Sequence, residues 1–115
     1  MEDGSPLYAQ IVKFIKRGAV AGTILDGDEL PSHRVLSARL GVNPNTVQKA
    51  YRMLEDEGLV QSHAGAKSLM VLSPKKTEEL RAELVRESID DAVAAWRAMG
   101  VTKEDALRLI DTYWK

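Results

Sequence analysis

Hydrophobic positions recur at helical spacing through the first half of the chain. A first helix is predicted to begin at Ser5-Pro6, where a capping serine precedes a proline whose missing N–H costs nothing at that position. The helix is expected to end at Gly22, because glycine readily adopts the left-handed conformation that closes a helix. Its apolar stripe consists of Leu7, Ile11, Phe14 and Ile15.

Two further helices follow at close spacing. Ser32 is the predicted cap of a helix that ends at Gly41, and Asn43 caps the next one, which Pro44 opens and Gly58 ends. A short connection that contains glycine is typical of a helix-turn-helix. The apolar residues of the two helices are Val35, Leu36 and Leu40, then Val47, Ala50, Tyr51 and Leu54.

The hydrophobic period changes after the third helix. Residues 59–62 and 68–71 form short strand-like runs, and residues 64–66 between them supply a turn. A hairpin that directly follows a helix-turn-helix is a wing. Residues 1–73 are therefore predicted to form a winged helix-turn-helix domain.

Residues 74–115 are predicted to form two more helices. Ser73-Pro74 starts a long helix that ends at Gly100, and Thr102 caps a last helix in which Asp105 is placed to reach back as in a capping box. The long helix carries a heptad-like seam and the last helix an apolar stripe. The seam consists of Val85, Ile89, Ala92, Trp96 and Met99, and the stripe of Leu107, Ile110 and Trp114.

The fold class that follows is mainly α with a small β-hairpin wing. The chain has 115 residues, 44% of them hydrophobic and 29% charged, as in an ordinary globular protein, and it has no cysteine. Disulfides and thiolate zinc sites are thereby excluded. No run approaches the roughly 18 apolar residues of a membrane span, so a cytoplasmic protein with no membrane partner is expected. Because there are only two histidines and no Ser/His/Asp grouping, we expect no catalytic residues, no metal and no cofactor.

Charge is segregated although the formal net charge is only -1. Residues 30–54 carry no acid, and residues 58–77 carry three lysines and again no acid. The basic residues of the first segment are Arg34, Arg39, Lys49 and Arg52. This pattern favours a basic face on a neutral protein, as nucleic-acid binding requires, with chance clustering on a solvated surface as the alternative.

The third helix has two chemically different faces. Asn45, Gln48, Lys49 and Arg52 share an arc of about 100° opposite the apolar residues. Asn and Gln can form bidentate pairs with adenine, while Lys and Arg suit guanine or phosphate. From the helical wheel alone, a solvated polar face remains an alternative to a DNA-reading one.

Four motifs occur in order between Pro6 and about Val71. They are Pro6-Leu-Tyr, Leu30-Pro-Ser-His-Arg, Leu40-Gly-Val-Asn-Pro-Asn-Thr-Val-Gln-Lys-Ala-Tyr and Leu54-Glu-Asp-Glu-Gly-Leu-Val. With these motifs the chain resembles the GntR family of bacterial transcription regulators, and residues 43–48 resemble its YtrA-type subfamily. The resemblance implies a sequence-specific, double-stranded-DNA-binding regulator, a homodimeric repressor of a palindromic operator. It also implies that residues 74–115 are a two-helix dimerisation region.

The resemblance makes the third helix the recognition helix. The residues expected to contact DNA are His33, Arg34, Asn43, Asn45, Thr46, Gln48, Lys49, Arg52, His63, Gly65 and Lys67. Arg34 matches the arginine of the family's Pro-Ser-x-Arg motif. Its alternative role is a surface ion pair with Asp26, Asp28 or Glu29.

The wing and the recognition helix depart from the common family pattern. Relatives often carry Gly-Arg-Gly-Thr in the wing, whereas this chain has Gly65-Ala-Lys-Ser, so Lys67 is expected to supply the charge one position along. Many relatives have arginine at the position of Gln48. Because this chain has glutamine there, its base readout is expected to shift away from arginine–guanine contacts.

Several alternatives remain open on the sequence. The seam and stripe residues are expected to form the dimer interface, but they could instead pack on the winged domain of the same chain. A winged-helix protein–protein adaptor without DNA binding is the competing function, motivated by the neutral net charge and the depleted wing. Binding of a small-molecule effector is a further alternative, but the sequence shows no group of polar residues that would form a site for one.

Overall fold

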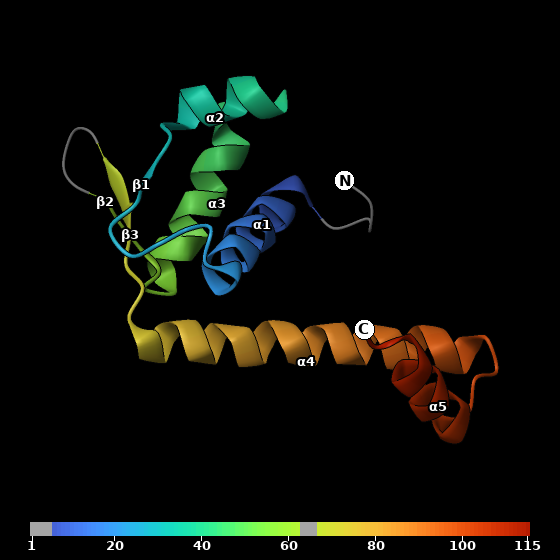
Figure 1. Cartoon of the computed structure of the whole chain (residues 1–115). Coiled ribbons are helices and arrows are strands. Elements are labelled where there is room, and N and C mark those ends of the chain that lie inside the picture. The colour runs from blue at the N-terminus through green and yellow to red at the C-terminus, as the bar shows by residue number, and fades with distance from the viewer. Residues whose placement is uncertain (1–5, 63–66) are drawn as a thin grey trace. The chain divides into compact units, whose positions relative to one another are not determined.

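The structure is a computed structural model that describes residues 6–62 and 67–115 (Figure 1). Within these residues, five helices and a small sheet confirm the predicted fold class. The elements in chain order are α1 (Leu7–Ala21), β1 (Glu29–Leu30), α2 (His33–Leu40), α3 (Pro44–Asp56), β2 (Val60–Ser62), β3 (Ser68–Met70), α4 (Pro74–Ala98) and α5 (Lys103–Tyr113). The chain divides into two compact units, the first ending at Arg81 and the second formed by Ala82–Lys115.

The start of α1 differs slightly from the prediction. Pro6 precedes the helix instead of opening it, and the Pro6 carbonyl accepts hydrogen bonds from the amides of Ala9 and Gln10 at 3.1 and 3.2 Å. Ser5, the predicted cap, lies outside the described residues. The predicted end at Gly22 is confirmed, because this glycine adopts φ 82° and closes the helix.

The helix-turn-helix forms between predicted caps. The Val35 amide donates to the Ser32 hydroxyl at 3.2 Å, and the Asn45 amide donates to the side-chain oxygen of Asn43 at 2.8 Å. Gly41 turns the chain between the two helices with φ 68°, a conformation that favours glycine. The two side-chain caps therefore fix where α2 and α3 begin.

The wing is part of a three-stranded antiparallel sheet, not of a hairpin alone. β1 was not predicted; it pairs with β3, so that the strand order is β1-β3-β2. The register places Leu30 opposite Ser68 and Val60 opposite Met70. A strand of two residues is too short to show an alternating pattern, and only its pairing with a distant segment identifies it.

The core of the first unit lies where α1 and α2 pack against α3 (Figure 1). Buried side chains come from every element of this unit, including the first turns of α4. They include Ile11, Val12, Ile15 and Ala19 from α1, Val47, Ala50, Tyr51 and Leu54 from α3, and Leu80 from α4. An ion pair of 2.8 Å between Lys16 and Glu57 joins α1 to the end of α3.

The second unit consists of the rest of α4 and α5. Thr102 caps α5 by accepting a hydrogen bond of 3.1 Å from the Asp105 amide, as predicted. The Asp105 carboxylate, however, binds Arg108 at 3.0 Å, so the reciprocal half of the predicted capping box does not form. No side chain of Ala82–Lys115 is buried. None of the helices that the structure describes has an apolar run long enough to span a bilayer.

Candidate nucleic-acid interface

The two faces of α3 are separated as the sequence predicts. Val47, Ala50 and Leu54 are 0% exposed, and Tyr51 is 2% exposed. The polar side chains of Asn45, Gln48, Lys49 and Arg52 are all exposed, and Thr46 is half-buried. The predicted rotation of the helix is therefore confirmed. A row of amides and cations stands on a helix whose other face is fixed in the core.

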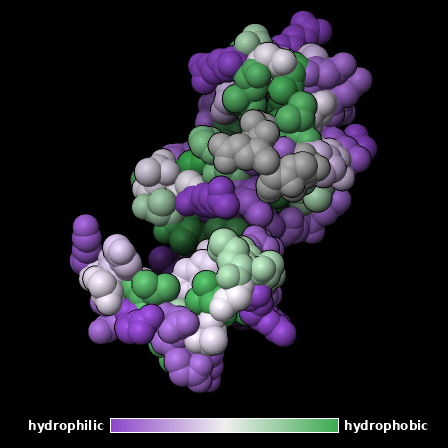
Figure 2. Space-filling view, turned by 90° about the vertical axis from the view of Figure 1, so that its right-hand side faces the viewer, coloured by the Kyte–Doolittle hydropathy of each residue, from purple (hydrophilic) through white to green (hydrophobic). Residues whose placement is uncertain are grey.

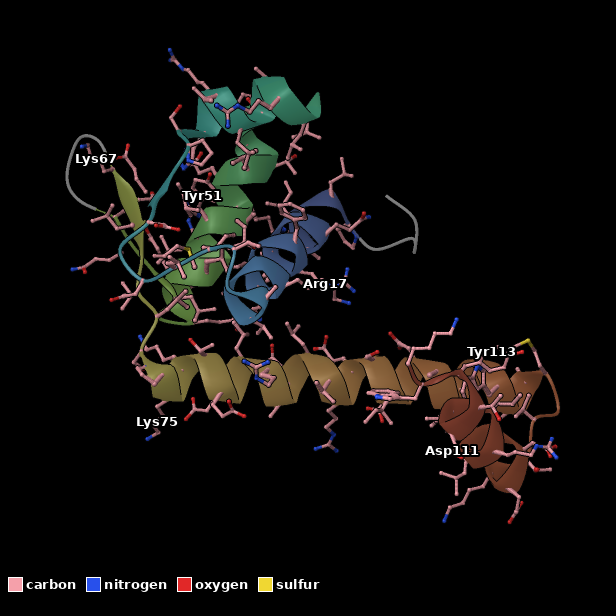
Figure 3. All side chains as sticks on the ribbon, in the orientation of Figure 1. Arg17, Tyr51, Lys67, Lys75, Asp111 and Tyr113 are labelled. Atoms are coloured by element: carbon pink, nitrogen blue, oxygen red, sulfur yellow. The ribbon has the colours of Figure 1, made fainter. Side chains whose placement is uncertain are left out.

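Tyr51 fastens α3 to the start of α2 (Figure 3). Its hydroxyl donates a hydrogen bond of 2.7 Å to the carbonyl of Pro31. The ring of His33 meets the Tyr51 ring edge-on, with 5.1 Å between the ring centroids. Burial raises the pKa of Tyr51 to about 12, because a phenolate would lose its hydration inside the core. His33, expected to contact DNA, thus also packs against a core residue.

Lys49 lies over the aromatic ring of Tyr8 on α1. The ammonium nitrogen is 3.9 Å from the ring centroid, the geometry of a cation–π contact. Sequence reasoning did not single out this pair, because the two residues are far apart in the chain and meet only when α1 packs on α3. Tyr8 therefore restrains the side chain of Lys49, which is part of the polar face of α3.

Arg34 is exposed at the start of α2, and it forms no ion pair with Asp26, Asp28 or Glu29, the alternative partners considered from the sequence. Asp26 accepts from the Leu72 amide and Asp28 from the Leu25 amide, each at 2.8 Å. Glu29 pairs with Lys67 instead. Within residues 6–62 and 67–115, Arg34 therefore has none of the three proposed ion pairs and is available to a partner.

The base of the wing carries one of the predicted cations, labelled in Figure 3. Lys67 forms an exposed ion pair of 3.5 Å with Glu29 on β1, the strand that was not predicted. Beside it, the Ser62 hydroxyl binds the carboxylate of Glu55 and lies 3.2 Å from the Ser68 hydroxyl. His63 and Gly65, the other wing residues expected to contact DNA, lie outside the described residues.

Asn43 has a structural task at the start of α3. Its side-chain oxygen caps the helix, which leaves the amide nitrogen as the group that could reach DNA. Six of the residues predicted from the sequence thus form two groups with different roles. Asn45, Gln48, Lys49 and Arg52 project together from α3, while His33 and Asn43 first hold the helices in place.

Known proteins resemble both the sequence and the fold. Residues 7–67 match the family described as "Bacterial regulatory proteins, gntR family". The HTH-type transcriptional repressor YtrA of Bacillus subtilis is 33% identical over 101 residues, which are 87% of this chain and 78% of that protein.

Two solved structures extend the comparison. A GntR family transcriptional regulator from Listeria monocytogenes superposes with a TM-score of 0.84 at 28% identity, covering 97% of this chain and 98% of the other. The DNA-binding domain of AraR in complex with the operator ORE1 superposes with a TM-score of 0.56 at 30% identity, over 62% of this chain and 87% of the other. The second likeness is to a DNA-binding domain that was solved in complex with an operator.

Proposed function

Because this chain belongs to the gntR family of bacterial regulatory proteins, we propose that it represses transcription as a homodimer that binds a palindromic operator. The observation that carries the proposal is the row of amides and cations on α3, whose opposite face is fully buried. A helix of this kind presents its side chains to base edges when it lies in the major groove. The named repressor YtrA and the operator complex of AraR support the same function.

Different residues of the interface take different roles in this proposal. Asn45 and Gln48 carry amides, which suit the donor–acceptor pattern of adenine. Arg34, Lys49 and Arg52 carry charges that suit phosphate or guanine. Phosphate contacts set affinity and orientation, whereas the amide contacts set the preferred base sequence. The absence of an acid between residues 30 and 54 keeps this surface attractive to DNA.

The second unit supplies the dimer interface in this proposal. No side chain of Ala82–Lys115 is buried, although α4 and α5 carry large apolar residues. Those expected at the interface are Val85, Ile89, Ala92, Trp96, Met99, Leu107, Ile110 and Trp114. A helical pair with no buried side chain has no core of its own, and packing against a second copy would provide one.

Selection of bound sites from random duplexes, followed by binding measured against salt, tests the proposal. We expect a symmetric motif whose half-sites are about 34–36 Å apart, or a multiple of that distance. Arg52→Gln should then weaken operator binding and reduce the salt slope by about one unit for each phosphate that the variant no longer neutralises. Lys103→Gln removes the same charge from α5 and should bind like the parent. Binding that is insensitive to both sequence and salt would refute the proposal.

A further inference from the structure

A groove of about 800 Å³ opens between α1 and α2 in the first unit. Both helices pack against α3, and Tyr51 of α3 contributes to the groove's lining. We call this feature the α1/α2 groove. It is defined by the apolar residues Phe14, Ile24, Leu36 and Leu40 and by the cations Arg17 and Arg39. Its volume falls in the range of pockets that hold small molecules, roughly 300–1,000 Å³.

The apolar side of the groove is open to solvent. Phe14 is 73% exposed and Leu40 is 42% exposed, although both occupy apolar positions of their helices. At the height of α2, Figure 2 shows hydrophobic surface bordered by hydrophilic side chains. Apolar area of this kind, placed in a concave site, gains free energy when a ligand removes it from water.

The charged side of the groove carries one sign only. Arg17 contributes to its lining from α1 and Arg39 from the last turn of α2, and no acidic residue is among the described residues that line it. Neither arginine has a hydrogen bond or an ion pair with another residue of the part of the chain that the structure describes. Two guanidinium groups that no described residue neutralises, placed beside an apolar wall, select for a ligand that is both apolar and anionic.

From this combination we propose that the α1/α2 groove binds a small amphipathic carboxylate. The aliphatic or aromatic body of the ligand packs against Phe14, Leu36 and Leu40, and its carboxylate meets Arg17 and Arg39. Because the groove is separate from the polar face of α3, this binding does not depend on DNA. Its failure would therefore leave the proposed repressor function intact.

Titration of the intact protein with decanoate, followed by the amide chemical shifts of ¹⁵N-labelled protein, tests the site. We expect saturable shifts confined to residues of α1, α2 and the adjoining part of α3. Decanol, which has the same chain without the charge, should bind more weakly, and decyltrimethylammonium, which reverses the charge, should bind least. Equal binding of decanoate and decanol, or shifts that do not saturate, would overturn the proposal.

Variants separate the charged and the apolar contributions. Arg39→Gln should weaken decanoate binding by about threefold or more and leave decanol binding unchanged, because it removes only a charge-assisted contact. Phe14→Ser should weaken both ligands, and its exposure means that the fold should survive the change. Lys75→Gln, which removes a charge outside the groove, should bind decanoate like the parent. If Arg39→Gln and Lys75→Gln behave alike, the guanidinium does not bind the carboxylate and the proposal is wrong.

A second copy of the chain is the competing occupant of the groove. Sedimentation of Phe14→Ser against the parent distinguishes the two cases. If this substitution weakens self-association while decanoate causes no saturable shift, the groove is an interface between copies, and the proposed ligand site is refuted. Unchanged self-association together with weaker decanoate binding would support the ligand site.

Discussion

Replacing Tyr51 by phenylalanine tests how the helix-turn-helix is held together. The substitution keeps the ring but removes the hydroxyl that donates to the Pro31 carbonyl at 2.7 Å. Because Tyr51 is 2% exposed, water cannot easily replace the missing donor. We expect the free energy of unfolding at pH 7 to fall by about 1 kcal/mol, the usual net value of one hydrogen bond.

The same substitution should have a different effect at high pH. Burial raises the pKa of Tyr51 from about 10 to about 12, so the folded protein keeps a proton that the unfolded chain releases. The resulting stability is fully present below pH 10 and is lost as the pH rises toward 12. At pH 11 the loss is about 1.4 kcal/mol for the parent protein, and Tyr51→Phe does not suffer it. The stability difference between the two proteins should therefore vanish near pH 11.

Urea unfolding at fixed protein concentration, repeated from pH 7 to pH 11, measures this convergence. Other groups titrate in the same range, but they do so in both proteins and cancel in the difference. Tyr8→Phe is the matched control, because the Tyr8 hydroxyl has no hydrogen bond to a described residue. It should follow the parent at every pH. A parent–variant difference for Tyr51 that stays constant with pH would refute the assigned burial of the phenol.

Further predictions concern the core, the base readout and the dimer. Leu54→Ala should lower the free energy of unfolding by about 2–5 kcal/mol in urea titrations, because Leu54 is 0% exposed. Met53 is only half-buried, so Met53→Ala should lower it by less. Gln48→Ala should relax the preference at one base pair of each half-site by about 1–3 kcal/mol in competition binding, and an equal loss on all sequences would contradict this role. Trp96→Ala should yield monomers in sedimentation and lower operator affinity by up to about 10²–10⁴, whereas Arg97→Ala should remain dimeric.

Local signals in the sequence predict the helices well. The hydroxyl of Ser32 and the side-chain oxygen of Asn43 accept the expected capping hydrogen bonds, and Gly22 and Gly41 end their helices with positive φ. These features depend on neighbours within four residues. They can therefore be recognised without knowing the fold.

Contacts between distant segments could not be predicted in the same way. β1 exists because Glu29 and Leu30 pair with β3, about forty residues further along the chain, and its own two residues carry no periodic pattern. The contact of Lys49 with Tyr8 likewise depends on how α1 packs against α3. A helical wheel assigns a side chain to a face, but it does not identify the neighbour that the side chain meets there.

The predicted apolar stripe also accounts for only part of the exposed apolar surface of α5. The predicted stripe contains Leu107, Ile110 and Trp114, and the last of these is 82% exposed. Leu109 and Tyr113, which lie outside that stripe, are exposed as well. Apolar residues on two sides of one helix indicate that more than one partner surface is needed to cover it. In the proposed dimer, α4 of the same chain and helices of the second copy would supply these surfaces.

Two of the cations expected to bind DNA already have a partner in the free chain. Lys49 lies over the Tyr8 ring, and Lys67 pairs with Glu29 across an exposed gap of 3.5 Å. At exposed sites a cation–π contact contributes about 0.5–1 kcal/mol and an ion pair about 0–1 kcal/mol. Exchanging either contact for a DNA phosphate therefore costs little, while the contact keeps the side chain close to the interface before DNA arrives. Substitution of Tyr8 or Glu29 should accordingly alter operator affinity less than substitution of the lysine that each one holds.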